Sequence, residues 1–249
     1  MNDMNVEELN KLVKEMVVYC KKYSIPIEHL FEILEDQKVV PMIRGKAMEY
    51  NALYALASIL SKRNWSVQKL NLNAQTGKTD EDISVTHRRS GISLKIESKS
   101  GVRGSMNNGE RARNIKEPHF KVKCHRSRSN ISLAGTSNDR YAVDTFDVII
   151  TNPLNALIQG NTVGEDLEII HNDKTKRVLY EFYDVDNNKD LLLKAENDWR
   201  FCIPSDIAEN GFIPRTPYVK LKNDPHWRPI QEIEKRLIAI VKEKHKERS

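Results

Sequence analysis

The sequence predicts a fold of the α/β or α+β class, in which helices cover a central β-sheet, and three observations support this prediction. Apolar residues recur at helical spacing near both ends of the chain. Between these segments, two short runs alternate apolar and polar residues on either side of a glycine-containing turn, as in a β-hairpin. A third run is strongly apolar, which is typical of a strand buried on both faces.

Four segments are predicted to be helical, because each places apolar residues at intervals of three and four positions. They span residues 5–23, 27–34, 44–63 and 229–241. We expect the first two to form a helical extension over residues 1–40, followed by a core domain over residues 41–249.

The strand signals all lie in the predicted core. The clearest are the alternating runs 83–86 and 92–96, which flank the turn Arg88-Arg89-Ser90-Gly91. The strongly apolar run covers residues 145–151 and is bounded by Asn152-Pro153. Two further strand candidates span residues 65–72 and 178–185.

The composition is that of an ordinary soluble globular protein, with 39% hydrophobic and 30% charged residues among 249. No run approaches the roughly 20 apolar residues that a membrane helix needs. The acidic N-terminal segment also lacks the basic start and apolar centre of a signal peptide, so we expect a cytoplasmic protein. The three cysteines, Cys20, Cys124 and Cys202, are widely spaced, and we expect them to be reduced thiols.

The predicted hairpin brings charged residues together at its open end. Side chains alternate between the two faces of a strand, so Glu97 and Lys99 share one face. Pairing about the turn places Asp82, which precedes the first strand, beside the end of the second. Two carboxylates can bind a hard divalent cation such as Mg²⁺, which polarises a phosphate and lowers the pKa of a bound water. A nearby lysine can orient or deprotonate that water, or offset charge in the transition state. These three residues therefore predict phosphodiester hydrolysis.

Two alternatives stay open at this site. Charged residues are frequent in this chain, so the same three residues are also compatible with the surface of an exposed hairpin. Asp80 is the second candidate for the aspartate ligand. Asp82 is preferred because it adjoins the apolar strand.

The order of these segments resembles the PD-(D/E)xK nuclease superfamily, and type II restriction endonucleases in particular. That family has a helix carrying a glutamate, a strand, an aspartate that opens a hairpin, and an apolar strand ending in ExK. The matching segments here are Gly45-Lys46-Ala47-Met48-Glu49, Trp65-Ser66-Val67, Asp82-Ile83-Ser84-Val85 and Ile96-Glu97-Ser98-Lys99. The resemblance covers about residues 44–100, and it departs from the family in having Thr79 rather than proline before Asp80. This departure leaves the choice of aspartate open.

The resemblance implies an α/β fold with a restriction-endonuclease-like core, in which a central mixed β-sheet is flanked by helices. It implies that Asp82 and Glu97 bind the metal and that Lys99 completes the catalytic centre. Glu49 would be an accessory catalytic acid, although a solvated helix carboxylate is an equal alternative. The expected cofactor is Mg²⁺, with one or two ions per active site.

Positive charge is concentrated directly after the ExK strand. Residues 102–130 contain eight lysines and arginines and two glutamates, a net +6, whereas the whole chain carries +5. Such cations bind phosphate, and arginine or asparagine can also read base edges. The candidate DNA-binding residues in this inserted segment are Arg103, Asn107, Asn108, Arg111, Arg113, Lys121, Lys123, Arg126 and Arg128. Arg126 and Arg128 are the candidates for reading bases, and a solvated loop is the alternative for the whole segment.

Together these observations predict a sequence-specific endonuclease that cuts double-stranded DNA, of the type II restriction kind. We expect a homodimer, because two-fold symmetric DNA sites favour two-fold symmetric proteins. Two other functions stay open: a DNA repair or recombination nuclease with the same core, and a DNA-binding protein without catalysis.

Overall fold

The computed structural model describes residues 5–70, 82–102, 117–126, 139–158 and 173–248. It divides into two compact units, residues 1–44 and 45–249, which are described separately below. Among the described residues, no helix has the length and hydropathy needed to cross a membrane.

The first unit is helical. Its first helix begins at a capping box, in which the Asn5 side chain accepts from the Glu8 backbone N–H and the Glu8 side chain accepts from the Asn5 N–H. Only two described apolar side chains of this unit, Cys20 and Leu30, are buried. Its elements are α1 (Val6–Lys22), η1 (Ile27–His29), α2 (Leu30–Leu34) and the start of α3 (Val40–Ile59).

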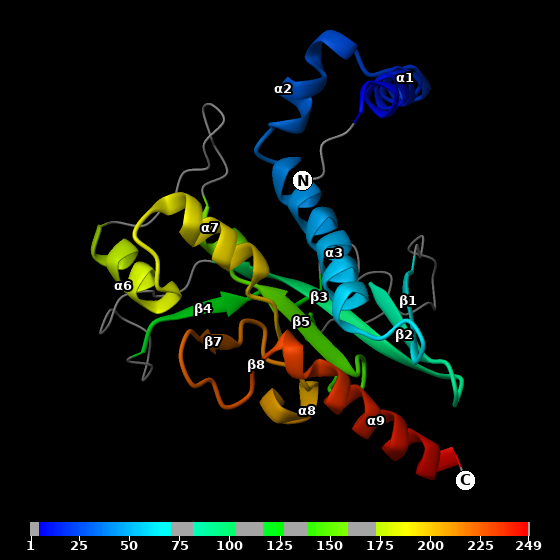
Figure 1. The fold of residues 1–249 in the computed structure, drawn as a ribbon, viewed down its shortest axis with the longest axis vertical. Coiled ribbons are helices and arrows are strands. Elements are labelled where there is room, and N and C mark those ends of the chain that lie inside the picture. The colour runs from blue at the N-terminus through cyan, green and yellow to red at the C-terminus, as the bar shows by residue number, and fades with distance from the viewer. Residues whose placement is uncertain (1–4, 71–81, 103–116, 127–138, 159–172, 249) are drawn as a thin grey trace. The chain divides into compact units, whose positions relative to one another are not determined.

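The second unit is built on a mixed β-sheet of eight strands among the described residues (Figure 1). Its main strand order is β1-β2-β3-β5-β6-β8, while β4 pairs with β3 and β7 pairs with β4. Strand β3 runs parallel to β5, and the other pairs are antiparallel. The strands are β1 (Trp65–Lys69), β2 (Ile83–His87), β3 (Ile92–Val102), β4 (His119–Val122), β5 (Val148–Asn152), β6 (Arg200–Cys202), β7 (Tyr218–Lys220) and β8 (Arg228–Pro229). The predicted α/β class with a central mixed sheet is therefore confirmed.

Two apolar clusters form the core of this unit, one on each face of the sheet. The first contains Ile83, Leu94 and Ile96 from the hairpin together with residues of α3 and α9. The second contains Phe120 and Ile149 together with residues of α5, α6 and α7. The helices of this unit, besides α3, are α5 (Leu154–Leu157), α6 (Asp173–Tyr183), α7 (Asn188–Asn197), α8 (Pro204–Ile207), η2 (Ile230–Glu232) and α9 (Ile233–Arg248). Because alternate residues of β3 face different clusters, Ile96 and Glu97 lie on opposite faces.

Most predicted elements are present, and one prediction is wrong. The hairpin is confirmed, with Val85 opposite Leu94 in the register of β2 and β3. The segment 178–185, predicted as a strand, instead belongs mainly to helix α6. The aromatic and β-branched residues of this segment favour a strand locally. This local preference is overridden because a helix buries Thr175 and Leu179, which lie one turn apart, on one side.

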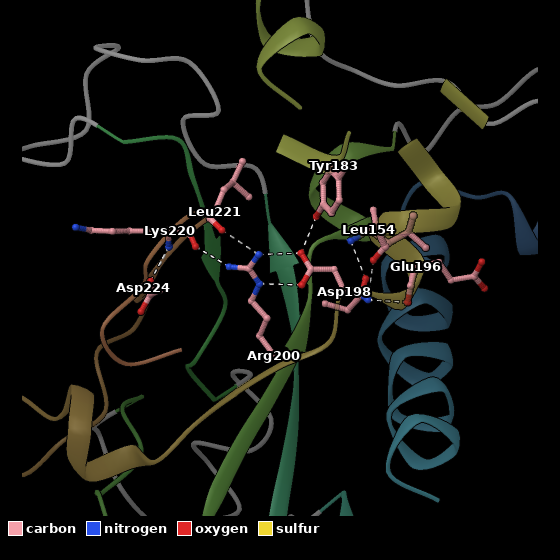
Figure 2. Close-up of polar contacts among 10 residues, drawn as sticks. Leu154, Tyr183, Glu196, Asp198, Arg200, Lys220, Leu221 and Asp224 are labelled. Atoms are coloured by element: carbon pink, nitrogen blue, oxygen red, sulfur yellow. Dashed lines mark hydrogen bonds and ion pairs between the residues drawn. The ribbon is translucent and has the colours of Figure 1, made fainter. Parts of the chain in front are cut away.

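A buried polar network surrounds β6 (Figure 2). The Arg200 guanidinium pairs with the Asp198 carboxylate through two contacts of 2.9 Å. It also donates to the backbone carbonyls of Lys220 and Leu221, at 2.6 and 3.2 Å. The Tyr183 hydroxyl donates to Asp198 at 2.7 Å. Because the buried charges all have partners, the network joins α6, β6 and β7 without leaving a charge uncompensated.

Candidate active site

The hairpin register brings Asp82 to the end of β3. Ile83 lies opposite Ile96, so the preceding residue on one strand, Asp82, comes opposite the following residue on the other, Glu97. The backbone N–H of Ser98 donates to the Asp82 carboxylate at 2.9 Å. The backbone carbonyl of Asp82 in turn accepts from the N–H of Leu70, at 3.1 Å, so the residue is also tied to β1. The structure thus brings Asp82 to the two residues of the ExK segment that were predicted to be its neighbours.

Glu97 and Lys99 form an ion pair on the face of β3 that carries the second apolar cluster. Glu97 is buried, and the Lys99 side chain is 16% exposed, so its ammonium lies at the border between core and solvent. The same ammonium is 3.5 Å from the Tyr141 hydroxyl and 4.9 Å from the centre of the Tyr141 ring. Lys99 is therefore held by a carboxylate and an aromatic ring rather than lying on an exposed surface.

Glu49 lies in α3 and belongs to a second carboxylate–lysine pair. Its side chain forms an ion pair with Lys69 at the end of β1, and both side chains are about nine-tenths buried. The exposed Lys46, one turn earlier in α3, also contacts Glu49, at 2.8 Å. Glu49 is therefore not the solvated helix carboxylate that was the alternative reading, although its catalytic role stays a prediction.

The electrostatics show that these groups act on one another. Burial, and next the negative charge of Glu49, raise the pKa of Asp82 to about 6, even though Lys99, the Ser98 N–H and Lys69 all act to lower it. Burial alone would lower the pKa of Lys99, but the Glu97 carboxylate outweighs it and raises that pKa above its ordinary value. The site therefore combines three carboxylates with two buried or half-buried lysines, and negative charge at Asp82 is disfavoured.

The donor chemistry of this site fits a hard divalent cation. Within the described part of the chain, no three acidic, histidine or cysteine side chains already stand in a metal-binding arrangement. Asp82 and Glu97 nevertheless supply oxygen ligands of the kind that Mg²⁺ prefers, and they come opposite each other in the hairpin. The raised pKa of Asp82 has the same implication, because a cation beside it would offset the charge that burial and Glu49 disfavour. Asp82 and Glu97 are thus the residues that would hold the metal, and Glu49 is close enough to Asp82 to raise its pKa.

The structure describes only part of the predicted DNA-binding segment. Lys121 lies in β4, and Lys123 and Arg126 follow it. Lys123 is exposed, and the Lys121 ammonium lies 5.4 Å from the centre of the Tyr218 ring in the neighbouring strand β7. The other candidates, Arg103, Asn107, Asn108, Arg111, Arg113 and Arg128, lie outside the described residues, as does Asp80.

Sequence reasoning missed two members of the site, Lys69 and Tyr141. Lys69 is the last residue of β1 and comes opposite Ile83 in the sheet, directly beside Asp82. A lysine at the end of a predicted strand carries no distinctive signal, although the predicted three-strand order could have placed it near the aspartate. Tyr141 is 42 residues from Lys99 in the chain and precedes β5, so only the folded structure brings it to the lysine.

Comparisons with known proteins give little further information. No protein-family model matches the sequence, and no curated protein is significantly similar to it. Among solved structures, the bacterial homing endonuclease I-Ssp6803I is similar over 86% of this chain and 99% of its own length. The two share 15% sequence identity, and the TM-score is 0.36. A likeness this distant transfers neither fold nor function, so the function is inferred from the site itself.

Proposed function

We propose that this chain is a metal-dependent endonuclease that hydrolyses phosphodiester bonds in double-stranded DNA, and that it acts as a type II restriction enzyme. One observation carries the proposal: the Asp82 carboxylate accepts a hydrogen bond from the backbone N–H of Ser98, the residue between Glu97 and Lys99, which form an ion pair with each other. This juxtaposition of two carboxylates and a lysine suits phosphoryl chemistry, because it can bind a hard cation and stabilise negative charge in the same place.

Each residue has a distinct role in this proposal. Asp82 and Glu97 bind Mg²⁺, which when bound polarises the phosphate and lowers the pKa of the attacking water. Lys99 faces the scissile phosphate and stabilises the charge that develops on its oxygens. Glu49 is an accessory acid, which Lys69 keeps in place. Lys121, Lys123 and Arg126 are part of the DNA-binding segment, and they would contribute the salt-dependent affinity that phosphate contacts provide.

The proposal includes a homodimer. A duplex presents two strands of opposite direction, and a two-fold symmetric pair of chains places one active site on each. This arrangement yields double-strand breaks at palindromic sites, which is what a restriction enzyme requires.

The test is cleavage of mixed plasmid and phage DNA by the purified full-length chain with Mg²⁺. Discrete fragments that disappear on addition of EDTA would support the proposal, provided that the Lys99→Ala variant prepared in the same way gives none. Nicks, or cutting of branched DNA alone, would instead indicate a repair or recombination nuclease. Tight binding with no cleavage under any divalent metal would contradict an enzymatic role.

A further inference from the structure

Two cationic side chains, those of Lys99 and Arg126, lie over the ring of Tyr141. The Lys99 ammonium lies 4.9 Å from the ring centre and the Arg126 guanidinium carbon lies 4.6 Å from it. The two cations are therefore no more than about 10 Å apart, both within cation–π range of one ring. Tyr141 itself is buried and makes an edge contact with Phe146, at 4.9 Å between ring centres, so its ring is fixed in the core.

Arg126 is held in position by two hydrogen bonds to backbone carbonyls, one from its own N–H and one from its guanidinium. Its N–H donates to the Asp139 carbonyl at 2.8 Å, and its Nη1 donates to the Arg140 carbonyl at 2.6 Å. The residue is half-buried, and a guanidinium has five N–H donors in a planar fork. Within the described part of the chain, no carboxylate forms an ion pair with Arg126, whereas Lys99 has Glu97. A positive charge without a described carboxylate partner thus lies beside a second cation on the same ring.

We propose that Arg126 binds a backbone phosphate of the DNA next to the one that Lys99 faces, and that Tyr141 positions both cations. The proposal rests on the proposed function, and it assigns Arg126 to the phosphate backbone rather than to base reading. A guanidinium binds phosphate through two parallel hydrogen bonds, which is the strongest geometry available to arginine. One DNA strand carries a phosphate for about every 3.4 Å along its axis, so two cations within about 10 Å match nearby phosphates of one strand.

Phosphate binding and base reading differ in how affinity responds to salt. The slope of log K against log salt is negative, and each lost phosphate contact reduces its magnitude by about 0.9. This reduction is the same on every duplex, whatever its sequence. For the Arg126→Ala variant we expect such a drop on random duplex DNA and on DNA that the wild type cuts. The Arg177→Ala variant removes an equal charge from the exposed side of α6, far from the site in sequence, and is the matched control. Its slope should equal that of the wild type.

The role of Tyr141 is tested with two variants and a double variant. Tyr141→Phe keeps the ring and should keep the salt slope, while Tyr141→Leu removes the ring and should lower the slope as Arg126→Ala does. Because both changes act on the same contact, the double variant Arg126→Ala/Tyr141→Leu should bind no more weakly than either single variant. Tyr141→Leu should also slow single-turnover cleavage by roughly tenfold to a hundredfold, the scale of one lost charge-assisted contact. Circular dichroism and thermal unfolding show whether Tyr141→Leu folds. If it does not, the salt slopes of Tyr141→Phe and Arg126→Ala test the inference in its place.

Three outcomes would overturn this inference. A loss of affinity confined to cleavable DNA would make Arg126 a base-reading residue, and an unchanged slope would leave it outside the interface. A wild-type chain that binds no duplex at all would reject both this inference and the proposed function. A wild-type chain that binds but never cuts would reject the proposed function alone, because the slopes still measure the phosphate contact.

Discussion

The backbone N–H of Ser98 donates to the carboxylate of Asp82 at 2.9 Å, which joins the aspartate to the residue between Glu97 and Lys99. This bond supports the choice of Asp82 as the aspartate of the proposed site, while Asp80 lies outside the described residues. We expect Asp82→Ala to abolish DNA cleavage and Asp80→Ala to have a milder effect. Cleavage of one plasmid substrate with Mg²⁺, measured over a range of metal concentrations, checks both variants. A dead Asp80→Ala protein beside an active Asp82→Ala protein would show that the wrong aspartate was chosen.

The raised pKa of Asp82 also predicts how the metal-free protein responds to pH. Its pKa of about 6 in the folded state exceeds the ordinary value of an aspartate near 4, so folding favours the protonated form. The stabilising contribution is complete below about pH 4 and is lost as the pH rises through about 6. Relative to Asp82→Asn, which does not titrate, the wild type should lose on the order of 2 kcal/mol of unfolding free energy between pH 4 and pH 7.

Urea unfolding of both proteins in EDTA, at pH 4, 5, 6 and 7, measures this difference directly. Added Mg²⁺ should restore stability to the wild type at pH 7 and have little effect on Asp82→Asn, because the cation offsets the charge of the ionised carboxylate. If the difference between the two proteins is constant over this pH range, the pKa of Asp82 is not raised.

Lys99 and Glu97 are predicted to act in chemistry rather than in DNA binding. Lys99→Ala should slow cleavage by roughly a hundredfold or more, as expected when a positioned charge is lost from a phosphoryl-transfer site, while duplex affinity changes little. Glu97→Ala should also abolish cleavage, because it removes a metal ligand. Gel-shift and cleavage assays on the same preparation separate the two effects. A Lys99→Ala protein that cuts at close to the wild-type rate would remove Lys99 from the mechanism.

Both substitutions also break a buried ion pair, so folding must be checked alongside activity. Removing one partner of such a pair commonly costs about 3–5 kcal/mol, because the remaining charge is left uncompensated. Thermal unfolding with and without Mg²⁺ therefore accompanies the assays, and only variants that are folded at the assay temperature are compared.

The pair formed by Glu49 and Lys69 gives a prediction about Asp82. Glu49 raises the pKa of Asp82 and Lys69 lowers it, so Glu49→Gln should lower that pKa and Lys69→Met should raise it. The pH at which metal-free stability begins to fall should move in the same directions. Lys46→Met is the matched control, because Lys46 also contacts Glu49 but from an exposed position, and charges screened by solvent act weakly on their neighbours. If Lys69→Met and Lys46→Met shift this pH equally, the charge of Lys69 does not act on Asp82 as the structure indicates.

The hairpin and its charges were predictable from sequence because the signals are local. Alternation in two runs and a turn between them fix which residues of β2 and β3 are opposite, and this in turn fixes the position of Asp82. The buried strand β5 was recognisable for a similar reason, since it contains the apolar residues Val148, Ile149 and Ile150 in succession. Its parallel pairing with β3 was not predictable, because a parallel pair is joined through distant chain and leaves no local pattern.

The parts that sequence reasoning missed depend on contacts between distant segments. Strands β4, β6 and β7 are three or four residues long, too short to show a period, and β4 lies inside a polar and basic segment. Phe120 and Val122 are fully buried there, but two apolar residues are too few to distinguish a strand from a loop. The prediction of a strand at 178–185 was wrong for a related reason. Local propensity does not determine which side chains of a segment will pack against the core.

A last prediction concerns Gly101, which lies two residues after Lys99 in β3. A Cβ atom at this position would lie 2.6 Å from the Asn152 carbonyl oxygen and 3.3 Å from the Phe120 ring. The oxygen belongs to the backbone of β5, so it cannot move aside as a flexible side chain would. Gly101→Ala should therefore force β3 and β5 apart, at a cost of about 1–3 kcal/mol in unfolding free energy, typical of overpacking.

The matched control is the same substitution at Gly45 in α3, where a Cβ would meet nothing within 4 Å. Alanine is preferred over glycine inside a helix by about 1 kcal/mol, so Gly45→Ala should stabilise the protein while Gly101→Ala destabilises it. Thermal unfolding should show the midpoint falling by several degrees in one variant and rising slightly in the other, at about 2–4 °C per kcal/mol for a chain of this size. Because Gly101 is in the same strand as Lys99, its substitution should also reduce cleavage at temperatures where the protein remains folded. Stability and activity that are both unchanged in Gly101→Ala would mean that β3 and β5 do not approach each other as closely as this at the end of the proposed site.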